Sequence, residues 1–310
     1  MSDKRVALAT CTDVHGLAAD DQPLVPELAK LGITAEPVVW NNPEVDWTSY
    51  DLTVIRSTWD YATQQEEFIQ WAQSVPHLAN PASVIAWDTD RRYLMELEKA
   101  GIPVIPTIWL EPSHHLSKRA IHSRMPAFGD FVVKPVVSAG AKDIARYQPI
   151  SAQSRSKAIT HTQRLLDSDR WVMIQPYVTS IDTDGETCMT FVDGQFCHAV
   201  RRHALLGGNM HQTLGLTLYP NNSTRSVEAT PEQIDVAQRA LALAKEATGE
   251  SEDFLYARVD LVKGEEGPLV IEIELTEPSL WMRYSGGAPT LKRLTQSIAR
   301  RVGVPVDAAA

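Results

Sequence analysis

Two neighbouring β-strand patterns near the C-terminal end restrict the fold and chemistry of this chain most strongly. The runs 254–263 and 268–276 are separated by a short polar connection that ends in Gly267, a common hairpin arrangement. We expect Asp260 to pair with Glu272 in this hairpin. Because side chains alternate along a strand, that register places four polar residues on one face. These residues are Arg258, Asp260, Glu272 and Glu274.

The opposite face of the hairpin is apolar and belongs in a core, with Leu261 expected to pair with Ile271. On the polar face, three carboxylates and one Arg leave excess negative charge, and like charges across strands repel unless a cation neutralises them. A hard divalent cation held by oxygen ligands would do so, and Mg²⁺ is usual beside phosphates. The alternative is a solvated hairpin face with a few ion pairs, since such faces are common.

The charge balance argues against a nucleic-acid-binding protein. The 310 residues include 29 Lys or Arg and 39 Asp or Glu, for a formal net charge of −10, without a basic run. No stretch approaches the roughly 18 continuous apolar residues of a membrane span, and the N-terminus has too short an apolar core for a signal peptide. We therefore expect a cytoplasmic protein without nucleic-acid or membrane partners; the sequence does not determine whether it forms a homo-oligomer.

Strand and helix patterns alternate through the first third of the chain. Strand patterns at 5–11, 35–40 and 51–57 enclose an amphipathic helix pattern at 23–31. This βαβ order predicts a parallel sheet covered by helices. After residue 184 the chain changes to antiparallel hairpins, so the fold class is mixed α/β.

A lysine inside a later strand pattern is a candidate for phosphate binding. Lys134 is followed by the small residues Ser138, Ala139 and Gly140, which let backbone N–H groups approach anionic oxygens. The familiar GxxxxGK[ST] and GxGxxG motifs are absent. Taken alone, an edge-strand Lys before a turn explains this segment better.

In combination, these segments resemble the ATP-grasp superfamily, over residues 85 to 300 and behind a βαβ domain. The resembling segments, in the family's order, are Asp90-Arg91-Arg92, Gly101-Ile102-Pro103, Val132-Val133-Lys134-Pro135, Gln175-Pro176-Tyr177-Val178, Gly185-Glu186, Arg258-Val259-Asp260 and Glu272-Ile273-Glu274. Within the superfamily the chain is most similar to the D-cycloserine synthetase type of small ligase. That similarity lies in VIRSTWDY (54–61), VIPT (104–107), VVKPVVSAGAKD (132–143), YARVD (256–260) and EIELTEPSLW (272–281).

The resemblance implies an ATP-grasp fold with three domains. The expected ranges are an N-terminal βαβ domain at 1–111, a central lid at 112–183, a C-terminal antiparallel domain at 184–305 and a frayed tail at 306–310.

The resemblance also implies a set of ATP contacts. Lys134 would contact the α- and β-phosphates, with the 138–140 loop covering them. Arg91 matches the family's earlier phosphate-binding Lys and gains bidentate geometry. The segment Gln175, Pro176, Tyr177 and Val178 would form the adenine-binding hinge, although many members have Glu at the position of Gln175. Glu186 would accept hydrogen bonds from the ribose.

Metal and catalytic roles follow from the same resemblance. Asp260, Glu272 and Glu274 match the family's Mg²⁺ ligands, although Asn is commoner at the position of Glu274. Two ions would fit, with Mn²⁺ as a substitute. Lys134, Arg91 and Arg258 would neutralise charge during phosphoryl transfer.

Candidates for substrate contact come from less specific observations. Arg56, Ser57, Asp60 and Tyr61 follow a parallel strand, where α/β sheets place their ligand crevice. A helix N-cap with aromatic packing explains that cluster equally well. Further candidates are Arg201 and Ser279. The segments WDTDRRYL and 201–215 depart from the family pattern, so the acceptor could differ.

The chemistry implied is ATP-dependent activation of a carboxylate as an acyl phosphate, which an amine-type nucleophile then attacks. In the cycloserine type, the amino-acid-like substrate O-ureidoserine cyclises with loss of its carbamoyl group. Two alternatives stay open: a ligase that joins two amino acids or peptides, and a nucleotide-binding regulatory module without catalysis.

Overall fold

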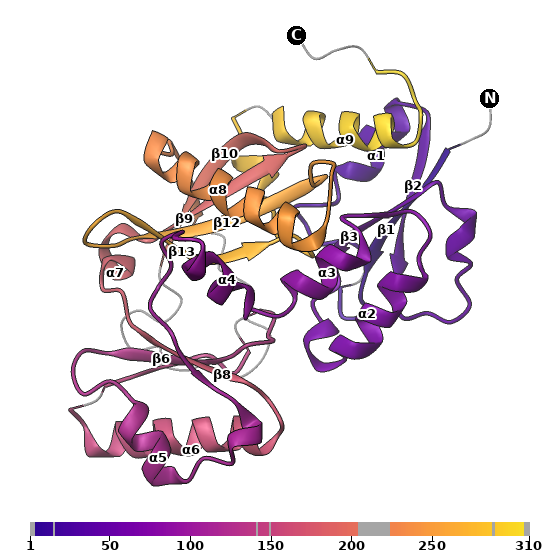
Figure 1. The fold of residues 1–310 in the computed structure, drawn as a ribbon. Coiled ribbons are helices and arrows are strands. Elements are labelled where there is room, and N and C mark those ends of the chain that lie inside the picture. The colour runs from indigo at the N-terminus through magenta and orange to yellow at the C-terminus, as the bar shows by residue number, and fades with distance from the viewer. Residues whose placement is uncertain are drawn as a thin grey trace.

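The computed structural model describes residues 4–14, 16–140, 142–148, 150–203, 224–286 and 289–306. They form one parallel and two largely antiparallel sheets with helices packed around them (Figure 1). The expected mixed α/β fold is confirmed. Among the described helices, none combines the length and the apolar character that crossing a membrane requires.

The N-terminal sheet is parallel, as the βαβ pattern predicted, with strand order β2-β1-β3-β4. Helix α1 buries Leu24 and Leu28, and the chain leaves it through Gly32, whose φ of +74° favours glycine. The elements are β1 (Lys4–Thr10), α1 (Leu24–Lys30), β2 (Ile33–Val39), β3 (Leu52–Ser57), α2 (Gln65–Ser74) and β4 (Leu78–Ala79), with short 3₁₀ turns at Trp47–Ser49 and Tyr61–Thr63.

The lid is a four-stranded antiparallel sheet in the order β5-β8-β6-β7, with α5 and α6 packed below it (Figure 1). Strand β5 pairs with β8, so the lid sheet begins ahead of the boundary expected at residue 112. The elements are β5 (Ile108–Leu110), a 3₁₀ turn (Pro112–His114), α5 (Lys118–Arg124), β6 (Phe131–Pro135), β7 (Ala145–Tyr147), α6 (Ala152–Asp167) and β8 (Val172–Pro176).

The third sheet has the order β11-β10-β9-β12-β13. Helix α8 begins with a capping box between Thr230 and Gln233 and ends at Gly249 in the left-handed conformation. The remaining elements are α3 (Ala82–Asp88), α4 (Tyr93–Lys99), α7 (Ser180–Asp184), β9 (Glu186–Val192), β10 (Gln195–Arg202), β11 (Thr224–Val227), α8 (Pro231–Thr248), β12 (Tyr256–Lys263), β13 (Pro268–Glu274), a 3₁₀ turn (Met282–Tyr284) and α9 (Pro289–Arg301).

The N- and C-terminal parts of the chain share hydrophobic cores. Leu294 and Ile298 of α9 pack in one cluster with Leu8 of β1 and Leu24 of α1. Helices α3 and α4 pack with α8 against the C-terminal sheet. The two domains therefore form one continuous body, to which the lid is attached at one side (Figure 1).

The hairpin of β12 and β13 has the expected register at its polar positions and a different register toward its turn. Asp260 pairs with Glu272 as predicted, but an irregularity after Asp260 pairs Leu261 with Val270 instead of Ile271. Ile271 consequently leaves the core face and lines a cavity. An irregular strand pair of this kind re-aims side chains, which alternation alone does not predict.

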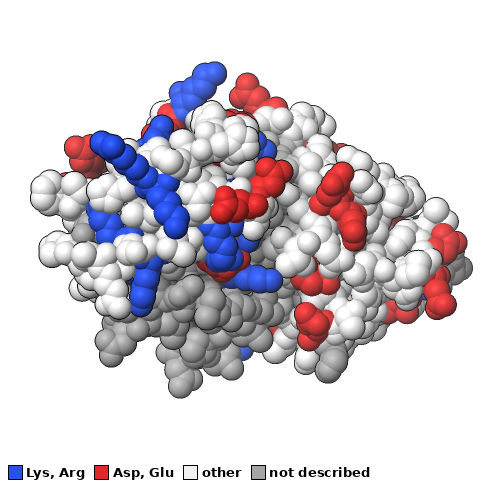
Figure 2. Space-filling view, turned by 90° about the horizontal axis from the view of Figure 1, so that it is seen from below, with Lys and Arg blue, Asp and Glu red and all other residues white. Residues whose placement is uncertain are grey.

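Charge is unevenly distributed over the surface. Seen from below, Lys and Arg side chains gather on the left of the molecule and Asp and Glu side chains on the right (Figure 2). Among the described residues, the exposed cations of the lid helices are Lys118, Arg119, Arg124, Lys157 and Arg164.

Candidate active site

Two adjoining cavities lie where the lid, the C-terminal sheet and loops of the N-terminal domain meet. The smaller has a volume of about 120 Å³ and the larger about 500 Å³. Both are lined by Arg91, Arg202, Glu272 and Ile144, so they meet at a strongly charged junction.

The smaller cavity brings together most of the residues expected to bind ATP. Its lining includes Arg91, Lys134, Gln175, Pro176, Tyr177, Val178 and Glu186. Gln175 is buried, and its amide nitrogen donates to Thr107 Oγ1 at 2.8 Å. Apolar side chains that sequence reasoning missed complete the walls: Ile105, Val132, Ile144, Ile181 and Ile271. A flat apolar slot beside a polar hinge suits a stacked aromatic base.

Two cations, Lys134 of β6 and Arg91 between α3 and α4, lie near the junction of the cavities. Lys134 is 6% exposed, and burial, reinforced by the nearby Arg91 guanidinium, lowers its pKa to about 8 although Glu272 and Glu186 oppose the shift. Arg91 forms an ion pair with Glu272 at 3.0 Å and donates to Ser138 Oγ at 2.9 Å. Ser138, Ala139 and Gly140 line the larger cavity next to it. These groups are suited to binding phosphate oxygens.

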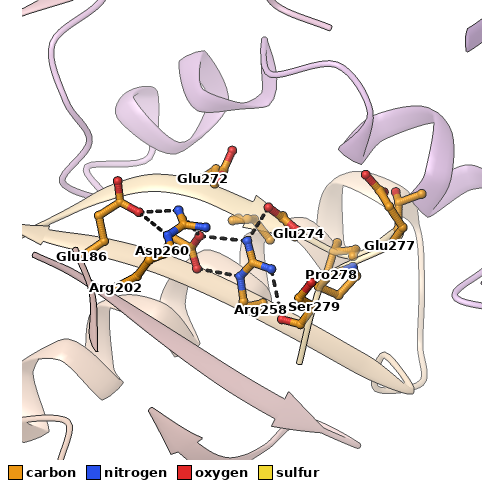
Figure 3. A network of polar contacts seen from close by, with 12 residues as sticks. Glu186, Arg202, Arg258, Asp260, Glu272, Glu274, Glu277, Pro278 and Ser279 are labelled. Atoms are coloured by element: carbon orange, nitrogen blue, oxygen red, sulfur yellow. Dashed lines mark hydrogen bonds and ion pairs between the residues drawn. The ribbon is translucent and has the colours of Figure 1, made fainter. Parts of the chain in front are cut away.

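The three expected metal ligands lie together. Asp260, Glu272 and Glu274 each offer an oxygen atom, and these atoms all lie within 4.8 Å of one another. Arg258 donates to both Asp260 oxygens, at 2.8 and 2.9 Å, and also pairs with Glu274 (Figure 3). The repulsion expected from the sequence is therefore offset by guanidinium groups. All three ligands are carboxylates, which suit a hard divalent cation.

The protonation of the carboxylates reflects this crowding. Burial favours the neutral form of Glu272, but the guanidinium of Arg91 and other nearby cations hold its pKa at about 2. Burial, together with the neighbouring Glu272 and Asp260, raises the pKa of Glu274 to about 8 despite Arg258. The face therefore carries one firmly ionised carboxylate beside one that readily holds a proton.

Arg202 lies in the site where Arg201 was expected. Its side chain lines both cavities and pairs with Glu186, with Nε at 2.9 Å from Oε2 (Figure 3). Arg201 instead donates to the Asp184 carbonyl at 2.5 Å and is absent from either lining. Because neighbouring strand residues point to opposite faces, only one of the two can reach the site. The pairing of Arg202 with Glu186 across β9 and β10 was the available signal.

Arg56 makes buried contacts between the N- and C-terminal domains and lines neither cavity. It is fully buried, pairs with Asp21 at 2.9 Å and donates to the Pro278 carbonyl at 2.8 Å. Its guanidinium also lies 4.8 Å from the centre of the Tyr256 ring. The expectation of a substrate contact is therefore corrected. Strand β3 is buried on both faces, and Arg56 spans the contact between the two domains.

Ser57 and Asp60, which follow Arg56 in the sequence, also make structural contacts outside the two cavities. Ser57 is buried and donates to Asp21 at 3.2 Å, while Asp60 accepts from the Trp40 indole at 2.8 Å. Neither lines a cavity. The alternative of an N-cap with aromatic packing describes Asp60 in part, since it precedes a 3₁₀ turn without a side-chain cap bond and contacts Trp40, whereas Ser57 makes a polar contact with Asp21.

Tyr61 and Ser279 do line the larger cavity, as expected. Sequence reasoning missed the other groups there, most of which lie in loops or at the ends of helices: the acidic residues Asp13, Asp20, Asp88 and Glu277, together with Trp59, Trp281 and Arg283. Burial raises the pKa of Asp88 to about 6 and that of Glu277 well above its ordinary value. Most of the departing segment 201–215, at 204–215, lies outside the described residues, as does most of the tail.

The chain is similar in sequence and in fold to known proteins. Residues 6–82 match the family model described as D-cycloserine synthetase DcsG, N-terminal domain. Over 306 residues the chain is 36% identical to the cycloserine biosynthesis protein DcsG of Streptomyces lavendulae, covering 95% of this chain and 98% of that protein. The crystal structure of D-cycloserine synthetase DcsG matches with a TM-score of 0.84 and 34% identity, covering 96% of this chain and 99% of that one.

A more distant match shows the fold alone. The D-alanine–D-alanine ligase from Bacillus anthracis has a TM-score of 0.61 at 16% identity, covering 96% of this chain and 97% of that one. The near-complete coverage by the DcsG matches extends from the N-terminal sheet through both cavities. The chain therefore belongs to the D-cycloserine synthetase family of ATP-grasp ligases, and it is an ATP-dependent ligase that acts on small molecules.

Proposed function

We propose that this ligase activates the carboxylate of O-ureidoserine as an acyl phosphate and closes the product into cycloserine. The observation that carries the proposal is the junction of the two cavities at Arg91, Arg202 and Glu272. A nucleotide in the smaller cavity would direct its terminal phosphate toward a substrate in the larger one. The 36% identity to DcsG over nearly the whole chain supports this choice of substrate.

The residues of the junction would act mainly by positioning and charge neutralisation. Phosphoryl transfer needs an in-line arrangement and stabilised oxygens more than covalent help from the protein. Lys134 of β6 and Arg91, between α3 and α4, would hold the phosphates, while Arg258 and Arg202 lie on strands β12 and β10 of the C-terminal sheet. Glu186 would accept from the ribose after releasing part of its contact with Arg202.

The carboxylate face fits a resident metal. Asp260, Glu272 and Glu274 would hold Mg²⁺, with two ions and substitution by Mn²⁺ both compatible with three carboxylates. When bound, the metal would neutralise phosphate charge and orient the triphosphate. Arg258 would then loosen its contacts with Asp260 and Glu274 and become available to the substrate.

In the second half of the reaction, the substrate supplies its own nucleophile. The nitrogen bound to oxygen in the ureido group attacks the acyl carbon, and phosphate leaves with the electron pair of the acyl–oxygen bond. Water then cleaves the bond between the ring nitrogen and the carbamoyl carbon, which leaves an N–H on the ring and releases the carbamoyl group as carbon dioxide and ammonia. A cavity of about 500 Å³ accommodates one such small molecule beside the phosphates.

Product analysis tests this proposal directly. The protein is incubated with ATP, Mg²⁺ and O-ureidoserine, and released phosphate and product mass are measured together. We expect stoichiometric phosphate release and the mass of cycloserine. Phosphate release only with pairs of amino acids, giving a condensed product, would favour the intermolecular ligase. Nucleotide binding without turnover on any substrate would favour a regulatory module.

A further inference from the structure

In the part of the chain that the structure describes, four carboxylates of the larger cavity lack the guanidinium partners found on Glu272 and Glu274. Two of them, Asp13 and Asp20, follow β1, and Asp20 accepts from the Met282 N–H at 3.1 Å; the other two, Asp88 and Glu277, lie in or beside the segment that follows Glu274. Glu272 pairs with Arg91, and Glu274 pairs with Arg258. Among the described residues, by contrast, no ion pair reaches Asp88 or Glu277. The ion-paired Glu272 lies at the junction, whereas Asp88 and Glu277 line the larger cavity alone.

Asp88 is oriented by the segment that follows the metal ligands. It lies at the end of α3 and is 8% exposed. Its Oδ2 accepts from the Leu275 N–H at 2.9 Å and from Thr276 Oγ1 at 2.6 Å. Its Oδ1 is buried and has no hydrogen-bond partner in the described part of the chain. A buried acceptor without a donor is costly unless a ligand supplies one.

Glu277 lines the same cavity, in the next residues of that segment. Its backbone carbonyl accepts from the Trp59 indole at 3.4 Å, and no hydrogen bond to its carboxylate is found among the described residues. In Figure 3 its carboxylate points away from the Arg258 network, and no dashed contact reaches it. Asp88 accepts from Leu275 and Thr276, and Glu277 is the next residue of that segment and lines the same cavity, so one cation bound there would face both carboxylates.

The surroundings favour an ammonium group over a metal ion. Among the described residues, the groups of three or more metal-ligating side chains occur only at the Asp260 face, and neither includes Asp88 or Glu277. The same cavity presents the aromatic rings of Trp59, Tyr61 and Trp281, which suit an organic molecule. The guanidinium of Arg283, also in the lining, lies over the Tyr284 ring at 5.0 Å.

We propose that Asp88 and Glu277 form a subsite for the α-ammonium group of the substrate, and so restrict the enzyme to α-amino acids. This inference rests on the proposed function, because the carboxylate to be activated must lie at the junction. Glu277 follows the metal ligand Glu274 by three residues. Arg258 and Glu277 line the same cavity, and Arg258 donates to the Ser279 carbonyl two residues after Glu277 at 3.1 Å, so an α-amino acid with its ammonium at Glu277 would have its carboxylate on the side of Arg258.

The test compares two substrates on matched variants. Wild type and Glu277→Gln are assayed with O-ureidoserine and with its des-amino analogue, 3-(ureidooxy)propanoate, in the phosphate-release assay with ATP and Mg²⁺. In wild type the ammonium should improve kcat/KM by about 10- to 100-fold, as expected for charge-assisted hydrogen bonds. Glu277→Gln should lose most of that preference, while the KM for ATP changes less than about twofold.

Control variants separate recognition from general damage. Glu266→Gln removes an exposed carboxylate from the turn of the same hairpin and should keep the wild-type preference. Asp88→Asn retains one acceptor for the 275–276 segment. Like Glu277→Gln, it should reduce the ratio of kcat/KM for O-ureidoserine to kcat/KM for the des-amino analogue. An unchanged preference in Glu277→Gln overturns the inference. If wild type turns over neither substrate, the proposed function fails first, and calorimetric binding of the two compounds with an ATP analogue and Mg²⁺ then tests the subsite alone.

Discussion

The two cavities differ in how their charges are satisfied and in which parts of the chain build them. The smaller is formed mostly by residues on or next to strands of two sheets, and two of its cations have ion-pair partners, Arg91 with Glu272 and Arg202 with Glu186. The larger is formed mostly by loops from distant parts of the chain, and it retains carboxylates without an ion pair among the described residues. In the proposed function, the cosubstrate would bind a largely preformed site, whereas the site that distinguishes substrates would await a complementary charge.

This contrast also explains which residues hold each cavity in shape. The smaller depends on strand pairing within the lid and the C-terminal sheet. The larger depends on long-range contacts such as Arg56 with the Pro278 carbonyl and Tyr256 Oη with the Ile55 carbonyl at 2.8 Å. Variants should therefore affect one cavity without the other.

The largest effect is expected from Arg56→Met, which removes the buried tether of the larger cavity. Leaving Asp21 buried without its partner should lower the free energy of unfolding by about 3–5 kcal/mol. In the folded fraction, the KM for the carboxylate substrate should rise while the KM for ATP stays nearly constant. Denaturant unfolding and the two Michaelis constants measure these effects.

The double variant Arg56→Met/Asp21→Leu is the control for that prediction, since it removes both charges and should recover part of the lost stability. A selective loss of ATP affinity in Arg56→Met would contradict the separation of the two cavities.

Lys134→Ala should damage the smaller cavity alone. Loss of one oriented charge in a water-poor site should reduce turnover by about 10²- to 10³-fold, equivalent to roughly 3–4 kcal/mol. ATP affinity measured by calorimetry should fall, while substrate binding changes little. The matched control is Lys157→Ala, an exposed lysine on α6. Normal ATP affinity in Lys134→Ala would remove this residue from the nucleotide pocket.

The lid that covers the smaller cavity should be acid-sensitive. Burial lowers the pKa of His161 to about 4, so the folded lid holds it neutral next to the Tyr147 hydroxyl at 2.9 Å. The unfolded chain binds that proton near pH 6.5. The contribution of neutral His161 to the free energy of unfolding is therefore complete above pH 6.5. It is lost as the pH falls toward 4, and the total loss is about 3 kcal/mol.

His161→Gln tests the acid sensitivity, because Gln is neutral throughout and can still bond to Tyr147. Unfolding curves between pH 7 and 4 should be flatter for this variant than for wild type. Equal slopes for the two proteins would assign the acid sensitivity to other groups.

The smallest effect is expected at the junction itself, where both cavities share Glu272. Glu272→Gln should raise the metal concentration needed for half-maximal activity by about tenfold, equivalent to about 1.4 kcal/mol. Arg91 loses its partner in this variant, so a small loss of stability should accompany the change. Titration with Mg²⁺ measures the shift, with Glu265→Gln as the exposed control. An unchanged metal requirement would argue against Glu272 as a ligand.

Sequence reasoning was most successful where short-range rules decide the outcome. Strand alternation placed Asp260, Glu272 and Glu274 on one face, and the βαβ pattern predicted the parallel sheet. It failed at Leu261 and Ile271, because an irregularity in pairing depends on tertiary contacts and not on the local pattern.

The larger cavity could not be predicted in the same way. Asp20, Asp88 and Glu277 are far apart in the sequence, and the local sequence around each predicts an ordinary surface carboxylate. Arg56 was misassigned because alternation does not show that both faces of a central parallel strand are covered. Family resemblance supplied the residues proposed to bind ATP, which lie on or next to strands β6, β8 and β9 or before α4, but it did not supply the loop residues of the larger cavity.

The packing of α9 against the first sheet has a consequence for how the chain folds during synthesis. Leu8 and Leu24 leave the ribosome early, but their core partners Leu294 and Ile298 follow more than 250 residues later. At roughly 5–20 residues per second, the first domain waits on the order of tens of seconds for its last helix. During that time its apolar face is exposed, so nascent chains should depend on slow release or chaperone protection, and variants that weaken α9 should reduce soluble yield before they reduce activity.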